Sequence, residues 1–513
     1  MALLGVDVGT THCKAALFTR AGKLVRLESR ATPTSRGENG GATHDPDELW
    51  STVCAVIRET VLDDPVEAVG VTSMAEAGLL LDAEGGEPRT PVLAWFDARA
   101  TSQAEDLTRR AGAADLFRRS GLHSSFKFGL PKLLWLEEHR RGITDGACWL
   151  SVADYIAYRL TGARATDPTL AARTFAYAIL DGRWDDAWIR DVGLDPALFP
   201  PVLPSGAPAG AVSERGGSES GLRRGIPVSV CGHDHICSML AAGVVEPGTL
   251  LDSMGTAESL MAVADRPDLG DEAVASGLAL VPHVLPHRFC WLGGLSASGG
   301  SVEWMRRMMQ DPPRSYGEAQ AEVDAAGADP TGILYYPYLL GSGAPRPDRQ
   351  VRGAFTGLRA EHTRGHLLRA VLEGVAYEAQ SVREAIERVT ATPIRDVVAV
   401  GGGTRNSTWM QIRADVLGCV HTVPTVEEAA AFGAALLAGI GSGTLAGVDE
   451  VVEIARFHRE VGTSVLPNGE RHAIFHALYE HAYLPLQTPL RQQAAAMADL
   501  PVPAPVQLEG AAR

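Results

Sequence analysis

Two cysteines, two histidines and an aspartate fall within residues 231–237, whose sequence is CGHDHIC. Cysteine and histidine are the ligands that structural zinc sites use. The spacing argues against zinc, because residues that alternate along a strand point to opposite faces, and no CxxC or HxxxH pair is present. A buried strand end would explain the cysteines as small hydrophobic side chains. It leaves Asp234 unexplained, so a catalytic carboxylate and a polar strand end both stay open on these residues alone.

A Gly-Thr turn between two apolar segments occurs twice, in GVDVGTTHCKAALF (residues 5–18) and in LLDSMGTAESLMAV (residues 250–263). Glycine lets a ligand approach the backbone closely, and backbone N–H groups with a threonine hydroxyl suit phosphate. Asp7 of the first copy is replaced by Ser253 in the second, which is the asymmetry expected of a site for Mg²⁺ and a chain of phosphates. The repeat predicts two domains of like fold that face each other across a cleft. Two ordinary β-hairpins are the alternative.

Three further glycine clusters lie in the second half, at residues 293–304, 341–349 and 398–411. None has the GxxxxGK[ST] pattern of a phosphate loop or the GxGxxG pattern of a dinucleotide fold. The third cluster, VAVGGGTRNSTWMQ, indicates a strand, a glycine turn and a helix. That geometry leaves room for a flat ring against the backbone, with Asn406 available for hydrogen bonds. Together with the turn at Gly255, these clusters indicate an adenine nucleotide site.

These segments need a scaffold of strands and helices to position them. Segment 45–63 starts with Asp-Pro and has apolar residues three and four apart, which predicts a helix. Residues 131–140 and 151–162 predict two more helices, the second ended by a glycine. Segments 66–74 and 78–97 have strand character. Strands and helices alternate in this way along the chain, which predicts an α/β protein with mixed sheets.

Length and composition define the class of protein. A chain of 513 residues is too long for one compact core, so we expect domains at residues 1–242 and 243–488, followed by a flexible Ala- and Pro-rich tail at 489–513. The formal charge of −16 argues against a nucleic-acid partner. The sequence has no apolar run long enough for a membrane span. Seven scattered cysteines do not suit a secreted disulfide framework, and MALLGVDVGTT lacks the basic region of a signal peptide. We therefore expect a cytoplasmic protein.

On these motifs the chain resembles the FGGY carbohydrate kinases, the relatives of fuculokinase, xylulokinase and glycerol kinase. DVGTTHCK resembles the family's first phosphate loop, VGGGTRN its adenosine-binding turn, and residues 353–374 one family signature. PKLLWLEEHR fits a second signature in part, because Gly129 stands where Pro, Ser or Thr is usual. The resemblance extends from about residue 3 to residue 450. It implies two actin-like (RNase H-type) domains, with mixed sheets flanked by helices, that close on a sugar and ATP.

The resemblance also implies residue roles. Asp234 corresponds to the catalytic base, and Asp7 together with Asp234 to the Mg²⁺ site. A sugar hydroxyl is a poor nucleophile, which a positioned carboxylate can orient and deprotonate. The rest of phosphoryl transfer is positioning and neutralisation of charge. The residues implied to contact ATP are Gly9, Thr10, Thr11, Lys14, Gly255, Thr256, Gly299, Gly402, Gly403 and Asn406.

The choice of sugar depends on residues 71–82, VTSMAEAGLLLD, which align with the family's sugar-contact loop. Glycerol kinase-like members have Arg-Glu there and xylulokinases Met-His, whereas this chain has Ala75 and Glu76. Glu76 can accept hydrogen bonds from two hydroxyls, which suits a small ketose or polyol. Asp97 and Arg99 could equally be a structural pair. The other candidate sugar contacts are Trp95, which could also be a core residue, His233 and His235.

The same fold also serves ATPases of another class. An actin- or Hsp70-like ATPase that acts through a protein partner is the alternative, although such proteins lack the sugar loop and the GHD turn. The resemblance thus predicts a kinase that uses ATP, Mg²⁺ and a small sugar or polyol. A homodimer is possible on the sequence.

Overall fold

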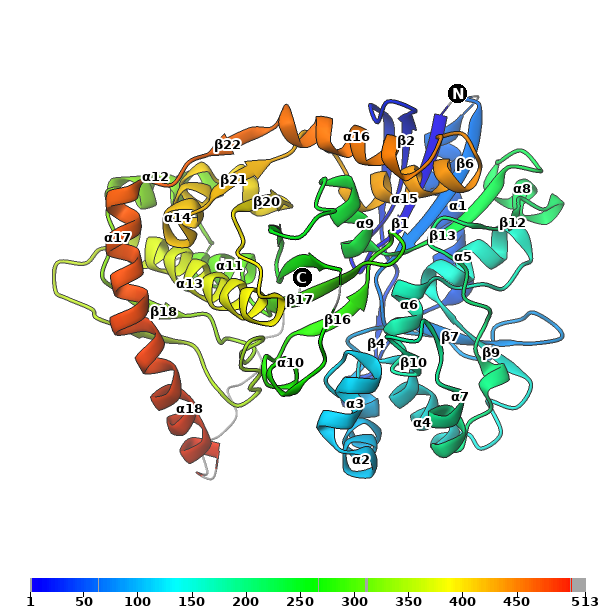
Figure 1. Ribbon diagram of the computed structural model, residues 1–513, viewed down its shortest axis with the longest axis horizontal. Helices are drawn as coiled ribbons and strands as arrows, with labels where there is room; N and C mark the ends of the chain where they lie inside the picture. Colours follow the sequence, from blue (N-terminus) through cyan, green and yellow to red (C-terminus); the bar gives the residue numbers. More distant parts are fainter. Residues whose placement is uncertain (1, 63, 266, 310–311, 499, 501–513) are drawn as a thin grey trace.

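The computed structural model describes residues 2–62, 64–265, 267–309, 312–498 and 500 of the chain. Two large mixed sheets form the centres of its two halves (Figure 1). The first sheet has the strand order β12 (Pro208–Ala211), β13 (Pro227–His233), β6 (Val66–Ser73), β1 (Ala2–Val8), β2 (His12–Thr19) and β3 (Leu24–Ala31). The second has the order β16 (Ala279–Pro282), β17 (Phe289–Leu295), β15 (Glu258–Ala264), β14 (Thr249–Met254), β20 (Asp396–Val400), β21 (Val420–Val423) and β22 (Thr463–Val465).

The two sheets repeat one topology. In the first, β1 pairs with β2 antiparallel and with β6 parallel, and β6 pairs with β13 parallel. In the second, β14 pairs with β15 antiparallel and with β20 parallel, and β20 pairs with β21 parallel. The β1–β2 and β14–β15 turns are the two Gly-Thr turns found in the sequence. The structure therefore confirms the α/β class with mixed sheets and the internal repeat.

Helices and a smaller sheet surround the first large sheet. The smaller sheet has the order β4 (Ser35–Arg36), β5 (Ala42–His44), β8 (Val92–Leu93), β7 (Gly78–Asp82) and β9 (Ala147–Ser151), and β10 (Tyr177–Ala178) pairs with β11 (Arg183–Trp184). The helices of this half are α1 (Pro46–Val61), α2 (Thr101–Ala111), α3 (Ala113–Ser120), α4 (Gly129–His139), α5 (Val152–Thr161), α6 (Pro168–Ala172), α7 (Asp186–Asp191), α8 (Glu214–Ser220) and α9 (Asp234–Ala241).

Local signals explain where the predicted helices begin and end. Asp45 caps α1 by accepting hydrogen bonds from the first backbone N–H groups, and Pro46 occupies the first helical position, where no N–H is needed. Ser151 and Asp154 form a capping box at the start of α5, and Gly162 ends it in the left-handed conformation with φ of 83°.

The second half contains nine α-helices among the described residues, of which α13 with 27 residues is the longest. They are α10 (Asp271–Ala275), α11 (Gly299–Met309), α12 (Tyr316–Ala325), α13 (Arg364–Thr390), α14 (Ser407–Leu417), α15 (Ala429–Gly441), α16 (Val448–Glu460), α17 (Gly469–Leu478) and α18 (Leu484–Ala498), with the hairpin of β18 (Leu334–Tyr336) and β19 (Ala354–Thr356). Two of them return to the first half: α15 packs on its sheet, and α16 packs on α15 and α9 (Figure 1).

Very small residues allow α15 to lie against the first sheet. A Cβ on Gly5 of β1 would lie 1.9 Å from the backbone oxygen of Ala431, and one on Gly70 of β6 would lie 2.1 Å from that of Ala434. Both distances are far below van der Waals contact, so only glycine permits this approach. The predicted domain boundaries at residues 242 and 488 stay predictions, and this helix belongs by its packing to the first half.

The predicted tail begins inside a helix. Residues 489–498 continue α18, which starts at Leu484. The buried side chain of Gln487 donates a hydrogen bond to Glu378 Oε1 at 3.1 Å, and Arg491 donates to Ser342 Oγ at 3.3 Å. These contacts order a segment whose Ala-rich composition predicted a loose chain. Residues 501–513 of the predicted tail lie outside the described residues.

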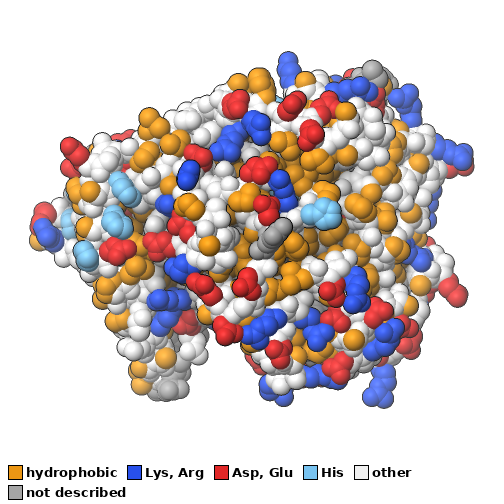
Figure 2. Space-filling model, viewed as in Figure 1, with side chains coloured by type: hydrophobic (Ala, Val, Ile, Leu, Met, Phe, Trp, Pro, Cys, Tyr) orange, Lys and Arg blue, Asp and Glu red, His pale blue; other side chains and the backbone are white. Residues whose placement is uncertain are grey.

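The surface mixes both signs of charge. On the face shown in Figure 2, acidic and basic side chains are interspersed and form no continuous basic stripe. Among the described residues, no helix is long and apolar enough to cross a membrane.

Candidate active site

The backbone just before Asp234 has an irregular geometry. Cys231 has no partner on β6, so β13 contains a bulge there, which bends the strand and redirects the side chains that follow. Gly232 has a φ of 109°, and a Cβ on it would lie 2.3 Å from Thr169 Oγ1, so only glycine fits. Helix α9 then begins at Asp234, with His233 as the residue before it. The GHD sequence therefore places one carboxylate at the end of a strand and the start of a helix.

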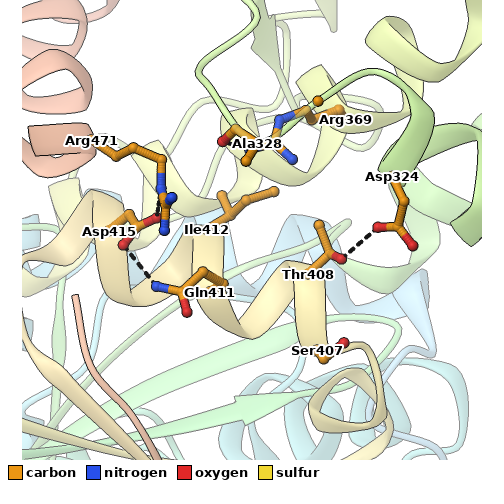
Figure 3. Close-up of a pocket in the computed structure, with 10 residues that line it drawn as sticks. Asp324, Ala328, Arg369, Ser407, Thr408, Gln411, Ile412, Asp415 and Arg471 are labelled. Carbon is orange, nitrogen blue, oxygen red and sulfur yellow. Dashed lines mark hydrogen bonds and ion pairs between the residues drawn. The ribbon is translucent and has the colours of Figure 1, made fainter. Parts of the chain in front are cut away.

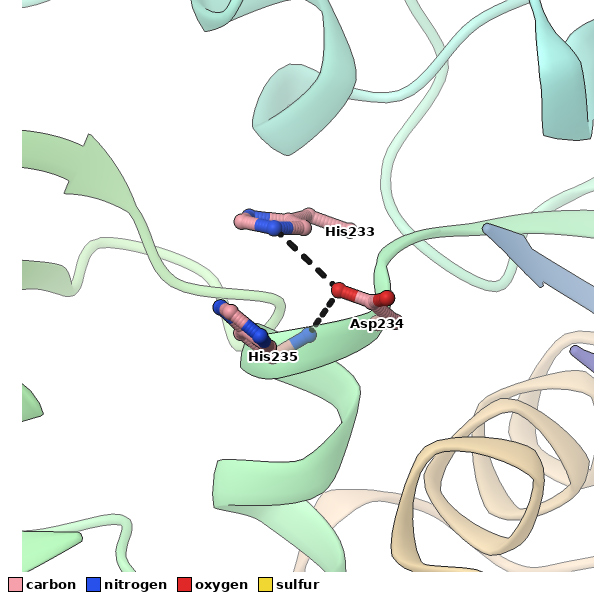
Figure 4. Close-up of side chains that lie close together, drawn as sticks. All are labelled: His233, Asp234 and His235. Carbon is pink, nitrogen blue, oxygen red and sulfur yellow. Dashed lines mark hydrogen bonds and ion pairs between the residues drawn. The ribbon is translucent and has the colours of Figure 1, made fainter. Parts of the chain in front are cut away.

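The two oxygens of the Asp234 carboxylate differ in their surroundings. Oδ1 accepts a hydrogen bond from the backbone N–H of His235 at 2.6 Å and lies 3.2 Å from His233 Nε2 (Figure 4). No described residue donates to Oδ2. Burial alone would raise the pKa of this carboxyl, but the neighbouring His235 and His233 lower it below the ordinary value. Asp234 is therefore ionised near neutral pH and has one oxygen free to accept a proton.

The cysteines of the same segment point away from this carboxylate. Cys231 and Cys237 are fully buried, and their thiols donate to the backbone oxygens of Ala434 and Cys231, each at 3.3 Å. Burial raises the pKa of both thiols, which keeps them protonated. The atoms that lie within 4.8 Å of one another belong instead to His233, Asp234 and His235. The Cys₂His₂ arrangement that zinc would need is thus not formed.

Asp7 is a second carboxylate, half-buried like Asp234, and it lies close enough to Asp234 to feel its charge. Its Oδ1 atom is buried and has no hydrogen-bond partner among the described residues. Burial, followed by the charge of Asp234, raises the pKa of Asp7 to about 8, while Lys14 opposes the shift. Lys14 pairs with Glu428 at 2.6 Å. Two neighbouring carboxylates with an unsatisfied oxygen fit a hard divalent cation such as Mg²⁺.

The first Gly-Thr turn is held by its neighbours. Gly9 N donates to His12 O at 3.0 Å, and the Gly9 carbonyl accepts from Thr32 Oγ1 at 2.7 Å. Thr10 Oγ1 accepts from Trp95 Nε1 at 2.9 Å, so the indole of Trp95 is tied to this turn. Thr11 is exposed. The turn presents backbone and a threonine hydroxyl on a fixed frame, as phosphate binding requires.

The second Gly-Thr turn packs against the start of α11. The N–H of Gly299 donates to Gly255 O and the N–H of Gly300 to Thr256 O, both at 3.0 Å. A Cβ on Gly299 would lie 2.7 Å from Gly255 O, so glycine is needed for this approach. Gly255 and Thr256 are exposed. The structure therefore supports a role for Gly299 in holding this turn.

The glycine turn after β20 lies beside the same strand end. A Cβ on Gly403 would lie 2.8 Å from the Cβ of Met254, whereas Gly402 has open space around it. Asn406 Oδ1 accepts from Trp409 N at 2.9 Å and caps α14. Its amide NH₂ group makes no hydrogen bond within the described residues and is left for a ligand. The predicted nucleotide residues of the second half are therefore brought together at the ends of β14 and β20.

Glu76 of the predicted sugar loop has an ion-pair partner that sequence reasoning missed. Its Oε1 accepts from Arg173 Nε at 2.8 Å and also from Arg173 Nη2, and both side chains are about nine-tenths buried. Burial would raise the pKa of Glu76, but Arg173 overcomes this and lowers it to about 2. Arg99 pairs with Asp97 at 2.5 Å, as the structural alternative for these two residues predicted. Arg173 lies 97 positions away from Glu76, so no local pattern could reveal the pair.

Lys132 joins two loops of the candidate sugar site. Its buried Nζ donates to Glu76 O at 2.6 Å and to Ala94 O at 2.9 Å, just before Trp95. Burial lowers the pKa of Lys132 to about 7. Trp95 is half-buried and Ala75 is buried in the core of the first half. The two loops therefore offer the Glu76 carboxylate and the Trp95 indole to a ligand, rather than the methyl group of Ala75.

Comparison with known proteins decides the family. Residues 2–241 match the sequence model of the N-terminal domain of the FGGY family of carbohydrate kinases, and residues 250–442 match that of its C-terminal domain. The chain belongs to the FGGY family of carbohydrate kinases.

Relatives of this FGGY kinase include enzymes with two different acceptors. A xylulose kinase of Bacillus subtilis is 28% identical over 493 residues, which cover 94% of this chain and 96% of the relative. A glycerol kinase of Thermus brockianus is 33% identical over 461 residues, covering 86% and 90%. The solved structure of a xylulose kinase from Rhodospirillum rubrum superposes with a TM-score of 0.86 at 27% identity, covering 96% and 100%. Nothing supports the alternative of an actin- or Hsp70-like ATPase, so the protein is an ATP-dependent carbohydrate kinase.

A separate hollow of about 250 Å³ lies between α12, α13, α14 and α17 of the kinase (Figure 3). Its polar side chains bind one another: Thr408 Oγ1 donates to Asp324 at 2.8 Å, and Gln411 and Arg471 donate to Asp415 at 2.9 and 2.6 Å. None of the predicted site residues lines it, and these polar groups bind one another without a ligand.

Proposed function

We propose that this kinase transfers the γ-phosphoryl group of ATP to a hydroxyl of a small ketose or polyol, with Asp234 as the general base. The observation that carries the proposal is the asymmetric carboxylate, in which His235 N–H and His233 occupy Oδ1 and Oδ2 is free. The acceptor oxygen attacks the γ-phosphorus, its proton passes to Asp234 Oδ2, and the bond to the bridging oxygen of ADP breaks. The proton is then released to solvent.

The other predicted residues take supporting roles in this proposal. Gly9, Thr10 and Thr11 face the phosphates from the first half, and Gly255 with Thr256 from the second. Gly402, Gly403 and the amide of Asn406 receive adenosine. Asp7, with its unsatisfied oxygen, and Asp234 would hold Mg²⁺. The bound ion would supply positive charge to the phosphates of ATP. Lys14 forms an ion pair with Glu428, and its charge lowers the pKa of Asp7. In this conformation it is therefore assigned to Asp7 rather than to a phosphate. A homodimer remains a prediction.

Glu76→Gln tests the sugar loop. Loss of a buried charged acceptor costs about 1.5–3 kcal/mol, so kcat/KM for the preferred acceptor should fall roughly 10- to 150-fold. The KM for ATP should stay within about twofold, because Glu76 lies in the first half and the adenosine turn in the second. Steady-state kinetics with each substrate varied, together with the melting temperature, provide the measurement.

A matched control is Asp82→Asn. Asp82 ends β7 of the smaller sheet, and its carboxylate pairs with Arg89 at 2.7 Å. The substitution should leave both KM values unchanged. If Glu76→Gln lowers the melting temperature and affects both substrates alike, Glu76 has only a structural role beside Arg173.

A further inference from the structure

Lys127 is a cationic side chain of the sugar site that the mechanism above does not use. It lies in the segment between α3 and α4, and its Nζ is 5.2 Å from the ring centroid of Trp95. Trp95 in turn donates its indole N–H to Thr10 of the first phosphate turn. The ammonium group is therefore located between the sugar loops and the turn that faces the phosphates.

The segment that carries Lys127 is anchored on both sides. The next residue, Phe128, is buried, stacks on Phe175 with ring centroids 5.5 Å apart and receives the guanidinium of Arg173 at 5.3 Å from its ring. One turn into α4, Lys132 is bonded to the backbone of Glu76. The position of Lys127 relative to Glu76 is thus set by packed neighbours rather than by a mobile loop.

The charges that act on Lys127 are mostly positive, since Arg173 and Arg349 face one carboxylate, Glu76. Within the described part of the chain, its ammonium group makes no hydrogen bond or ion pair. Glu76 is the carboxylate whose charge acts on it, but Oε1 of Glu76 already accepts two donors from Arg173. Arg173 Nη1 is buried without a partner, and the charge of Arg349 from the second half also acts on Lys127. Burial lowers the pKa of Lys127, because its positive charge is taken out of water without a full counter-charge.

An ammonium group has three donors and no acceptor, so its best partner is an oxygen that only accepts. A carbonyl or carboxylate oxygen meets this condition. A hydroxyl oxygen can also accept, but it carries a donor of its own that needs an acceptor elsewhere in the site. Hydrogen bonds between a charged donor and such an oxygen are the stronger kind.

We propose that Lys127 is a specificity-determining residue that hydrogen-bonds a carbonyl-type oxygen of the acceptor, so that this kinase prefers an open-chain ketose or an aldonate to the corresponding alditol. The inference rests on the proposed function, because it assigns the acceptor of the same phosphoryl transfer. It narrows the acceptor to compounds that carry an sp² oxygen beside their hydroxyls.

The test compares matched sets of ketose, alditol and aldonate with the same carbon chain, from four to six carbons, in the wild-type kinase and in Lys127→Met. In at least one set, kcat/KM for the ketose or the aldonate should exceed that for the alditol by roughly tenfold or more. Lys127→Met should lower that value about 10- to 150-fold and leave the alditol within about threefold. A preferred aldonate would lose affinity with rising salt and a preferred ketose would not, which separates the two sources of the oxygen.

Lys23→Met, at an exposed turn between β2 and β3, is the control and should change none of these values. Equal losses for ketose, aldonate and alditol in Lys127→Met would overturn the inference and place Lys127 on the transferred phosphoryl group. Preference of the wild-type protein for the alditol would also overturn it and leave the kinase proposal intact. Failure of every compound to be phosphorylated would overturn both.

Discussion

Asp234→Asn should reduce kcat by about 10²-fold or more, the lower end of what loss of a general base costs, while binding of sugar and ATP stays within roughly tenfold. The amide oxygen of asparagine can keep the hydrogen bond from His235 N–H, so the shape of the site is retained. Its NH₂ group, in the place of Oδ2, cannot accept a proton. Single-turnover and steady-state rates, together with the dissociation constants of both substrates, measure the separation of chemistry from binding.

The matched control is Asp45→Asn. Asp45 is also a carboxylate at the start of a helix, but it caps α1, and asparagine is an equally good cap. Its kcat should equal that of the wild type. Near-wild-type kcat in Asp234→Asn would remove Asp234 from the role of base.

Asp7→Asn should raise the Mg²⁺ concentration needed for half-maximal activity by roughly 10- to 100-fold, the usual cost of losing a residue that supports a bound metal. The same change should leave the melting temperature of the metal-free protein unchanged or higher. The reason is that burial and the charge of Asp234 raise the pKa of Asp7 to about 8, so the ionised carboxylate is unfavourable without a cation. Activity against Mg²⁺ concentration and thermal unfolding in chelator measure the two effects.

Asp252→Asn is the matched control for Asp7, because Asp252 is a fully buried carboxyl whose pKa burial likewise raises to about 8. It lies in β14 of the second half, and its substitution should not change the Mg²⁺ requirement. Activity that is lost with one tightly bound zinc, and not restored by Mg²⁺, would contradict the proposed site. Oxygen ligands favour Mg²⁺, and the buried thiols of Cys231 and Cys237 are unavailable to zinc.

The local parts of this site could be predicted from the sequence. The repeated Gly-Thr turns predicted the shared topology of the two sheets, because a turn and its flanking strands are contiguous in the chain. The GHD segment singled out Asp234 as a candidate, and its role as the base, which the family resemblance implied, stays a proposal. The glycine cluster at 402–403 predicted a strand, a turn and a helix, which the structure contains.

The distant partners could not be predicted. Arg173 reaches Glu76 across 97 positions and Glu428 reaches Lys14 across 414, and neither lies in a pattern that marks it. The return of α15 to the first sheet depends on the absence of side chains at Gly5 and Gly70, which a single sequence does not connect with Ala431 and Ala434. The clearest case is the sugar loop, where this chain has Ala75 in place of the arginine of glycerol kinase-like members. Arg173 pairs with Glu76 from outside this loop.

ATP turnover with and without a panel of small ketoses and polyols, in the presence of Mg²⁺ and with products followed by phosphorus NMR, tests the central claim most directly. The account predicts strong stimulation by at least one compound and formation of ADP and a sugar phosphate in equal amounts. Hydrolysis of ATP to inorganic phosphate at the same rate without any sugar, stimulated only by a protein partner, would contradict it.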